Sequence, residues 1–202
     1  ETITRVRKWG YNYLKLDFLY ASALPGVRYT KMPAEQAYRQ GLEIMRQAAG
    51  DAYILVCGAP IMASLGLADG TRVGPDVAPY WDNFDRSFVL NDLSGPSTLN
   101  AIRTTLGRLW LRPLLHVDPD VVFFRTRYNL MDEEQKQLLC DLATIAGFKA
   151  TSDLPHWLDD AERQALVDFL QAEADWQKTG NYQFNVNGRD VDFSFVRDLW
   201  PD

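Results

Sequence analysis

The chain has few of the residues that build disulfide frameworks or metal centres. Its 202 residues include only two cysteines and two histidines. Cys57 and Cys140 lie far apart in apolar segments, so neither a disulfide framework nor a thiolate metal site is expected. Two histidines are also too few for a histidine-based metal centre. The low cysteine count favours a cytoplasmic location.

Basic residues and long apolar runs are also scarce. The 21 lysines and arginines are outnumbered by 27 aspartates and glutamates, which gives a net charge of -6. Without a cluster of basic residues, the chain lacks the electrostatic footprint of a nucleic-acid binder. No apolar run reaches the roughly 18 residues that would span a membrane, and the charged residues 1–10 do not resemble a signal peptide. We therefore expect no nucleic-acid partner and no membrane partner.

What the chain does have is enough apolar sequence for a substantial core, with 47% hydrophobic residues. Its length indicates one domain or part of a larger one. Strands are predicted at residues 13–20, 52–57, 71–76, 114–116 and 148–151. Helices are predicted at residues 33–49, 98–111, 132–147 and 159–175. This alternation predicts an α/β fold with a parallel sheet covered by helices.

The pattern changes near the C-terminus. Residues 182–186 and 190–196 each have the composition of a strand, and Asn187-Gly188 lies between them. An Asn-Gly pair is typical of the tight turn of a β-hairpin. We therefore predict a C-terminal β-hairpin.

Two of the predicted strands end in an aspartate that follows a basic residue. Lys15 and Asp17 share one strand face, and Arg72 and Asp76 share one too if that strand runs so far. A buried carboxylate is costly unless it is paired, so two such strand ends favour a shared site. Paired aspartates are typical of acid/base chemistry. Taken alone, however, Lys15 and Asp17 would more often form a structural ion pair.

Two topologies fit this order of elements, an open doubly wound sheet and part of a barrel. The first strand is followed by Asp17-Phe18-Leu19-Tyr20 and not by the glycine-rich loop of a nucleotide-binding sheet. Polar residues at the ends of successive strands are instead typical of a (β/α)8 active site. These residues are Asp17, Cys57, Asp76, Asp118 or Asp120, and Asp153. Five strands make an incomplete barrel, so we expect either a fragment or a barrel completed by another chain.

Two segments resemble the signature blocks of family 36 of the glycoside hydrolases, the microbial α-galactosidases. They are WGYNYLKLDF at residues 9–18 and DGTRVGPDVAPYW at residues 69–81. Between them, Cys57-Gly58-Ala59-Pro60 resembles the Cys-Gly block of the family. Asp118-Pro119-Asp120 and Ser152-Asp153 resemble its later strand ends. The resemblance covers roughly residues 2–170, with the blocks in the family's order.

The resemblance implies that residues 1–178 are the C-terminal part of a (β/α)8 TIM-type catalytic barrel, about its last five strands with their helices. Residues 179–202 would hold the β-hairpin and begin a possible C-terminal β domain. In the family, a β-sandwich domain and the first three barrel strands precede this part. We therefore expect the partner of this chain to be the missing N-terminal half of the barrel or an oligomer partner. The isolated chain is expected to be inactive and prone to associate.

The resemblance also implies the roles of five residues. Asp17 corresponds to the nucleophile and Asp76 to the general acid/base, while Lys15, Cys57 and Arg72 correspond to sugar-binding positions. A retaining glycosidase needs its two carboxyl groups about 5 to 5.5 Å apart. The implied substrate is a terminal α-linked galactose, and the reaction needs no metal or other cofactor. A related α-glycosidase, such as an α-N-acetylgalactosaminidase, and a non-catalytic half-barrel are the alternatives.

The remaining aspartates at strand ends have a simpler interpretation. We expect Asp118 and Asp120 to bind neighbouring backbone groups, as aspartates at turns usually do. For Asp153 the sequence favours neither a structural nor a functional role. Cys57, considered without the resemblance, would most often be a small buried hydrophobic residue.

Overall fold

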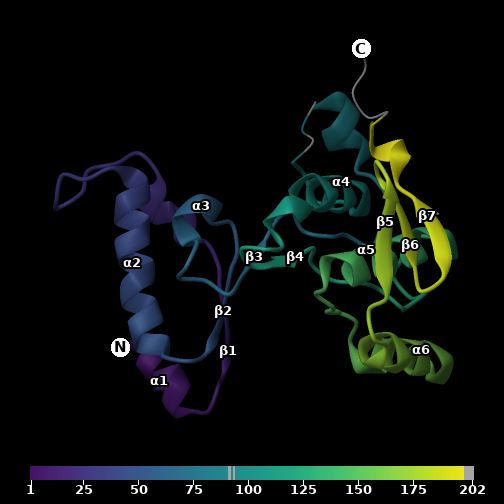
Figure 1. The fold of residues 1–202 in the computed structure, drawn as a ribbon, viewed down its shortest axis with the longest axis horizontal. Coiled ribbons are helices and arrows are strands. Elements are labelled where there is room, and N and C mark those ends of the chain that lie inside the picture. The colour runs from purple at the N-terminus through teal and green to yellow at the C-terminus, as the bar shows by residue number, and fades with distance from the viewer. Residues whose placement is uncertain (91, 93, 198–202) are drawn as a thin grey trace. The chain divides into compact units, whose positions relative to one another are not determined.

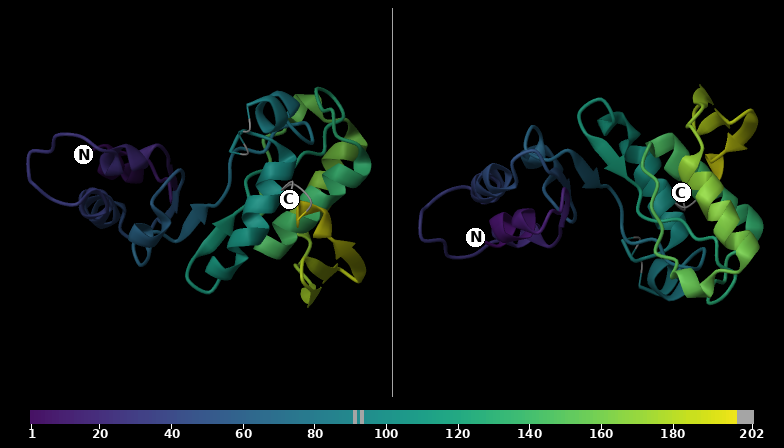
Figure 2. Two further views of the ribbon diagram at one scale, coloured as in Figure 1. Left: turned by 90° about the horizontal axis from the view of Figure 1, so that it is seen from above. Right: turned by 90° about the horizontal axis from the view of Figure 1, so that it is seen from below.

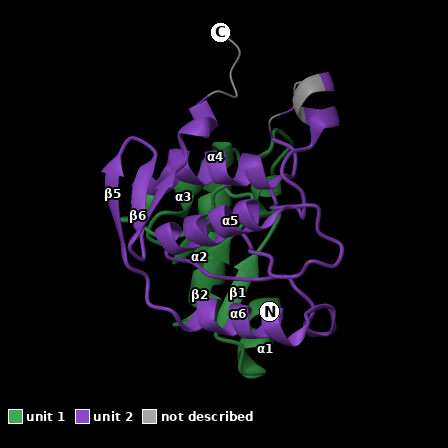
Figure 3. Ribbon diagram, turned by 90° about the vertical axis from the view of Figure 1, so that its right-hand side faces the viewer, with its two compact units in different colours: residues 1–73, 111–117 green, residues 74–110, 118–202 purple. Residues whose placement is uncertain are grey.

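The computed structural model describes residues 1–90, 92 and 94–197, and the chain divides into two compact units (Figures 1 and 3). Unit 1 comprises residues 1–73 and 111–117, and unit 2 comprises residues 74–110 and 118–202. Within the described ranges, the structure has no helix with the length and apolar character needed to cross a membrane.

Unit 1 is organised around a four-stranded sheet. The strands are β1 (Tyr13–Leu16), β2 (Tyr53–Val56), β3 (Gly70–Arg72) and β4 (His116–Asp118), in the spatial order β1-β2-β3-β4. Strand β2 pairs in parallel with both β1 and β3. The helices of this unit are α1 (Thr2–Lys8), α2 (Ala34–Ala49) and α3 (Ile61–Ser64). This confirms the predicted α/β fold with a parallel sheet and helices.

Helix α2 supplies much of the core of unit 1. Tyr38 and Leu42 are buried and pack with Leu14 of β1 and Ile54 of β2. The Tyr38 hydroxyl lies 2.8 Å from the Ser64 hydroxyl, which links α2 to α3. Burial raises the pKa of Tyr38, so this phenol stays neutral. The spacing of the buried residues along α2 is that of an amphipathic helix on a sheet.

The guanidinium of Arg46 holds α2 to the loops around β2 and β3. Its Nε donates to the Leu67 carbonyl at 2.7 Å, and one terminal nitrogen donates to the Ala52 carbonyl at 2.7 Å. The other terminal nitrogen bonds Asp69 at 2.5 Å. Asp69 also accepts from the Ile54 amide at 2.7 Å, so one ion pair fixes the helix, the strand and the following loop.

Unit 2 contains three longer helices and an antiparallel sheet. The helices are α4 (Thr98–Arg108), α5 (Glu133–Ala146) and α6 (Asp160–Gln171). The sheet consists of β5 (Trp176–Gly180), β6 (Gln183–Val186) and β7 (Arg189–Asp192). Its apolar face joins the same hydrophobic cluster as α4 and α5, through Phe184, Val186 and Val191. Figures 1 and 2 show this sheet, yellow-green to yellow, beside the helices of its unit.

The helices of unit 2 begin where the sequence indicates, but α4 ends at Arg108 and α6 at Gln171, three and four residues before the predicted ends. Asp132 and Gln135 form a capping box at the start of α5, and Asp159 and Glu162 form the same arrangement at α6. Gly147 ends α5 with a φ of 77°, a conformation that glycine adopts without strain. Shorter helical turns complete the described chain. They are Leu19–Ala23, Asp85–Val89, Leu109–Leu111, Pro155–Trp157 and Ser194–Arg197.

The fifth predicted strand, residues 148–151, is reduced to a single parallel bridge between Val122 and Thr151. The backbone of its first residue bonds to the preceding helix instead, because the Phe148 amide donates to the Ala143 carbonyl at 3.2 Å. The region predicted as a hairpin holds β6 and β7, and β5 adds a third strand beside them. Closure into a barrel and the division at residue 178 stay predictions, and residues 198–202 lie outside the described residues.

Replacing Leu142 by alanine should lower the free energy of unfolding by about 2–5 kcal/mol, because a fully buried side chain would leave a cavity in the core of unit 2. Chemical denaturation followed by circular dichroism measures the loss. The matched control is Leu130→Ala, since Leu130 is 83% exposed and should change stability by less than about 0.5 kcal/mol. Equal losses in the two variants would contradict the described core.

Candidate active site

The parallel pairing of β1 and β2 places Asp17 and Cys57 opposite each other. Leu16 and Val56 are paired in register, and the Cys57 amide donates to the Leu16 carbonyl at 2.9 Å. Each strand ends at its paired residue, so Asp17 and Cys57 are the first residues beyond the carboxyl edge of the sheet. Functional side chains of parallel α/β folds gather at this edge.

The Asp17 carboxylate is held at the point where the chain turns away from β1. The Phe18 amide donates to Asp17 Oδ1 at 2.7 Å, and Phe18 has a φ of 57°. Positive φ is uncommon for a residue other than glycine, and such strained conformations gather at functional sites. The turn directs the chain after Asp17 away from the strand and into the helical segment Leu19–Ala23.

Three of the predicted site residues, Lys15, Asp17 and Arg72, act electrostatically on the thiol of a fourth, Cys57. Burial raises the pKa of Cys57, and the positive charges of Arg72 and Lys15 partly oppose this effect. Asp17 raises the pKa further, through its negative charge and by accepting a hydrogen bond from the thiol. Lys15, Asp17, Cys57 and Arg72 therefore form one electrostatic cluster in unit 1.

The exposure of these side chains differs from what the strand pattern predicts. Arg72 is only 7% exposed, whereas Lys15 and Asp17 are exposed in this chain. The reason is that β1 is the last strand at one edge of the sheet, so among the described residues no further strand of unit 1 covers its outer side. Two positive side chains, one of them buried, still act on the Cys57 thiol that donates to Asp17.

Tyr20 and Gly58 border the same place, and sequence reasoning missed Tyr20. Gly58 has a φ of 58°, and a Cβ atom added there would lie 3.1 Å from the Tyr20 ring and 4.0 Å from Asp17 Oδ1. Glycine thus lets the backbone pass between the aromatic ring and the carboxylate. The glycine of the Cys-Gly block was a visible signal, but the contact with Tyr20 arises only from the fold.

Asp76 lies in unit 2, outside any strand. Strand β3 ends at Arg72, so the predicted strand over residues 71–76 is too long, and the condition under which Arg72 and Asp76 would share one strand face is not met. Pro75 has no amide hydrogen to donate to a sheet ladder, which explains why the strand does not continue to Asp76. The Asp76 side chain is exposed.

The backbone that follows Asp76 is fixed at five successive residues. The Val77 amide donates to Asp120 Oδ2 at 2.8 Å. The next four carbonyls, of residues 78–81, all accept hydrogen bonds. Their donors are the Thr98 hydroxyl for Ala78, the Leu130 amide for Pro79, the Thr98 amide for Tyr80 and the Leu99 amide for Trp81. Because three of these donors belong to the first turn of α4, the helix start and the Asp76 segment form one rigid piece of structure.

Asp118, Asp120 and Asp153 all bind backbone groups. Asp118 Oδ1 accepts from the Asp120 amide at 2.7 Å, as expected for an aspartate at a turn. Asp153 accepts from the Phe124 amide at 2.6 Å and forms a buried ion pair with Arg125. The contacts of Asp153 favour a structural role, which the sequence leaves open.

Asp17 belongs to unit 1 and Asp76 to unit 2, and each is described within its own unit. The separation of about 5 to 5.5 Å that a retaining glycosidase requires between them stays a prediction. Among the described residues, no group of three or more His, Cys, Asp or Glu side chains could hold a metal ion.

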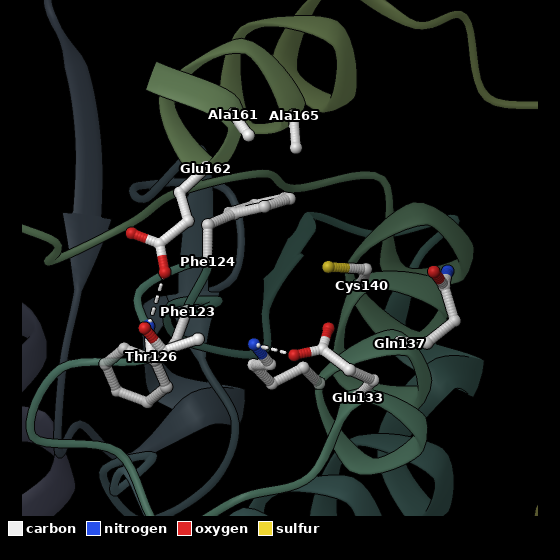
Figure 4. Close-up of a pocket in the computed structure, with 10 residues that line it drawn as sticks. Phe123, Phe124, Thr126, Glu133, Gln137, Cys140, Ala161, Glu162 and Ala165 are labelled. Carbon is white, nitrogen blue, oxygen red and sulfur yellow. Dashed lines mark hydrogen bonds and ion pairs between the residues drawn. The ribbon is translucent and has the colours of Figure 1, made fainter. Parts of the chain in front are cut away.

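A separate pocket of about 240 Å³ lies in unit 2, between α5, α6 and the segment 123–126 (Figure 4). Lys136 pairs with Glu133 at 2.5 Å, and Glu162 accepts from the Thr126 amide at 2.7 Å. Burial raises the pKa of Cys140, which also lines the pocket, to about 12. None of the predicted site residues lines this pocket, so it is distinct from the strand-end site.

A parallel sheet with an aspartate and basic residues at its carboxyl edge is typical of barrel glycosidases. The chain is 53% identical to an α-galactosidase from Thermus thermophilus in complex with p-nitrophenyl α-D-galactopyranoside, with a TM-score of 0.89. This match covers 96% of the present chain and 40% of that one. A second structure of the Thermus thermophilus enzyme, in complex with stachyose, is 57% identical with a TM-score of 0.78, over 85% of this chain and 37% of that one.

An α-galactosidase I from Mortierella vinacea shares the fold, with a TM-score of 0.62 and 15% identity over 91% of this chain and 50% of that one. No family model matches the chain. The solved structures confirm the resemblance to the family 36 α-galactosidases. The chain spans about 40% of the length of the Thermus thermophilus structures.

Both thiols should react slowly with iodoacetamide, because only the thiolate is nucleophilic and burial raises the pKa of each cysteine. In the folded protein at pH 8, Cys140, with a pKa of about 12, should be ionised in about one molecule in 10⁴ and remain unmodified. The alkylation rate of Cys57 should rise from pH 7 to pH 10. Peptide mass spectrometry measures both sites, and the urea-unfolded protein is the control. Equal rates in the folded and unfolded protein would contradict the burial of the thiols.

Replacing Gly74 by alanine should destabilise unit 2, because the added Cβ would collide with the Thr104 hydroxyl of α4. We expect a loss of about 1–3 kcal/mol in the free energy of unfolding. Gly107→Ala is the matched control, because Gly107 lies on α4, the helix that carries Thr104. Nothing lies within 4 Å of a Cβ at Gly107, so alanine should stabilise there, by about 0.5–1 kcal/mol. Chemical denaturation measures the free energy of unfolding of both variants. A change in the same direction in both would refute the close packing at Gly74.

Proposed function

We propose that this chain is the part of a retaining α-galactosidase that carries both catalytic carboxyl groups. The observation that carries the proposal is the 53% identity, over 96% of this chain, to an enzyme solved with an aryl α-galactoside. The cluster of Lys15, Asp17, Cys57 and Arg72 supplies the chemistry that such an enzyme requires. The complete protein would remove terminal α-linked galactose from galacto-oligosaccharides.

Asp17 is the nucleophile in this proposal. Its ionised carboxylate attacks the anomeric carbon and forms a covalent galactosyl-enzyme intermediate, which water then hydrolyses. Lys15 and Arg72 place positive charge near the carboxylate and donate charge-assisted hydrogen bonds to sugar hydroxyls. Cys57 forms a small, weakly polar wall, and its thiol donates a hydrogen bond to Asp17.

Asp76 is the general acid/base. As an acid it protonates the glycosidic oxygen of the leaving group, and as a base it takes a proton from the attacking water. Proton transfer requires a donor placed within hydrogen-bond reach of the reacting oxygen, so a rigid support is useful. The hydrogen bonds to the amide of Val77 and the carbonyls of residues 78–81 supply that support.

The barrel is completed by segments outside this chain. Within the part of the chain that the structure describes, β1 pairs with β2 and stands at the end of the sheet, so its outer edge can take up a further strand. The missing N-terminal half of the barrel, or an oligomer partner, would pair there and cover Lys15 and Asp17. The 202-residue chain alone would be inactive.

The ligands bound to the similar enzyme favour galactose as the sugar at this site. The Thermus thermophilus structures hold p-nitrophenyl α-D-galactopyranoside in one case and stachyose in the other. An α-N-acetylgalactosaminide and an α-glucoside are therefore the informative competing substrates.

The full-length protein that contains this chain should hydrolyse aryl α-galactoside much faster than aryl α-N-acetylgalactosaminide or aryl α-glucoside. Asp17→Ala should lose at least about 10³-fold in kcat, because it removes the nucleophile. Added azide should restore product formation and yield β-galactosyl azide in Asp17→Ala, but α-galactosyl azide in Asp76→Ala. Chromatography and NMR distinguish the two anomers.

Asp51→Ala is the control and should keep its activity, since the Asp51 side chain is 93% exposed and its described ion pair is with Arg7. Preference for another sugar would retain the mechanism and change the substrate. No hydrolysis of any of the three substrates by the full-length protein would overturn the proposed function.

A further inference from the structure

The mechanism above leaves two buried carboxylates without a task. Asp118 is 2% exposed and Asp120 is 8% exposed, and both lie in unit 2, where Asp118 is the last residue of β4 and Asp120 follows two residues later. Carboxylates are seldom buried unless hydrogen bonds or charges compensate for lost hydration. Their hydrogen bonds therefore indicate what they stabilise.

Asp120 contacts the segment of Asp76 directly. Asp120 Oδ2 accepts from the Val77 amide at 2.8 Å, and this amide belongs to the peptide group that joins Asp76 to Val77. A peptide group is planar, so a hydrogen bond to its N–H also fixes the carbonyl side, which is that of Asp76. On the other side, the ring of Pro75 restricts its own φ. The backbone of Asp76 is thus held from both directions.

Asp120 is itself held in an uncommon conformation. Its φ is 85°, in the left-handed region that residues other than glycine seldom adopt. Asp118 Oδ1 accepts from the Asp120 amide at 2.7 Å and favours this conformation. Strained residues of this kind persist where the surrounding structure fixes them, often at functional sites. Asp118 thus holds Asp120, and Asp120 holds the peptide group between Asp76 and Val77.

We propose that Asp120 is a positioning residue for the general acid Asp76, with Asp118 holding Asp120 in place. The inference rests on the proposed function, because it presupposes that Asp76 donates the proton. Removing the Oδ2 acceptor would free the Asp76–Val77 peptide to rotate and would move the acid away from the glycosidic oxygen. A displacement of about 1 Å is enough to cost about 10²-fold in rate.

The test compares two substrates of the full-length protein that differ in their need for an acid. Melibiose has a sugar leaving group that must be protonated, whereas 2,4-dinitrophenyl α-galactoside releases a stable anion that needs little help. The ratio kcat/KM covers the steps up to the first irreversible bond cleavage, so it reports the acid role of Asp76 and not its later basic role.

Asp120→Ala should lower kcat/KM for melibiose by about 10²-fold and for the dinitrophenyl substrate by less than about 5-fold. Asp120→Asn keeps an oxygen acceptor for the Val77 amide and should restore melibiose turnover to within about 5-fold of wild type. If Asp120 had a merely structural role, kcat/KM would fall by the same factor for both substrates. Asp132→Ala is the matched control. It also removes a unit 2 carboxylate that accepts a hydrogen bond from a backbone amide, that of Gln135 at 2.8 Å.

Equal losses on both substrates, no loss on melibiose, or an Asp120→Asn variant as impaired as Asp120→Ala would overturn the inference. Asp118→Ala removes the hydrogen bond to the Asp120 amide and should give the same selective loss, so it replaces Asp120→Ala if that variant does not fold. Asp76→Ala separates the two proposals. If it loses melibiose activity selectively while the Asp120 variants do not, only the positioning role fails. If it shows no selectivity, the acid role assigned to Asp76 fails.

Discussion

The register between β1 and β2 is the constraint on which the site in unit 1 depends. Leu16 and Val56 are paired, and the Cys57 amide is bonded to the Leu16 carbonyl. Asp17 and Cys57 meet only because both strands stop at this pair. A slip of one residue would turn every side chain of β1 to the opposite face, so Leu14 would leave the core and Lys15 would enter it. Core packing therefore also specifies the position of Asp17, the proposed nucleophile.

Local signals in the sequence predict the elements, and tertiary contacts decide where they end. The capping box at Asp132 and the stop at Gly147 follow from residues within α5 itself. The loss of the strand at residues 148–151 does not, because it depends on how the end of α5 competes for the Phe148 amide. Likewise, Pro75 is visible in the sequence, but the partners of the segment after Asp76 come from α4 and from Asp120.

The candidate site shows the same division. Lys15, Asp17, Cys57 and Arg72 are found from strand ends and from the resemblance, and the structure places them around one thiol. Tyr20 is missed because its contact with Gly58 crosses two loops that are distant in sequence. The exposure of Asp17 is missed as well, since alternation along a strand gives its faces but not whether it lies at the edge of the sheet.

Arg46 shows how much of unit 1 can depend on the shape of one side chain. Its flat guanidinium donates in one plane to the carbonyls of Leu67 and Ala52 and to the carboxylate of Asp69. Lysine would carry the same charge, but its ammonium group is a single point that cannot reach three acceptors spread over two loops. At this position charge and geometry are separate requirements, so the usual exchange of one basic residue for the other is not conservative.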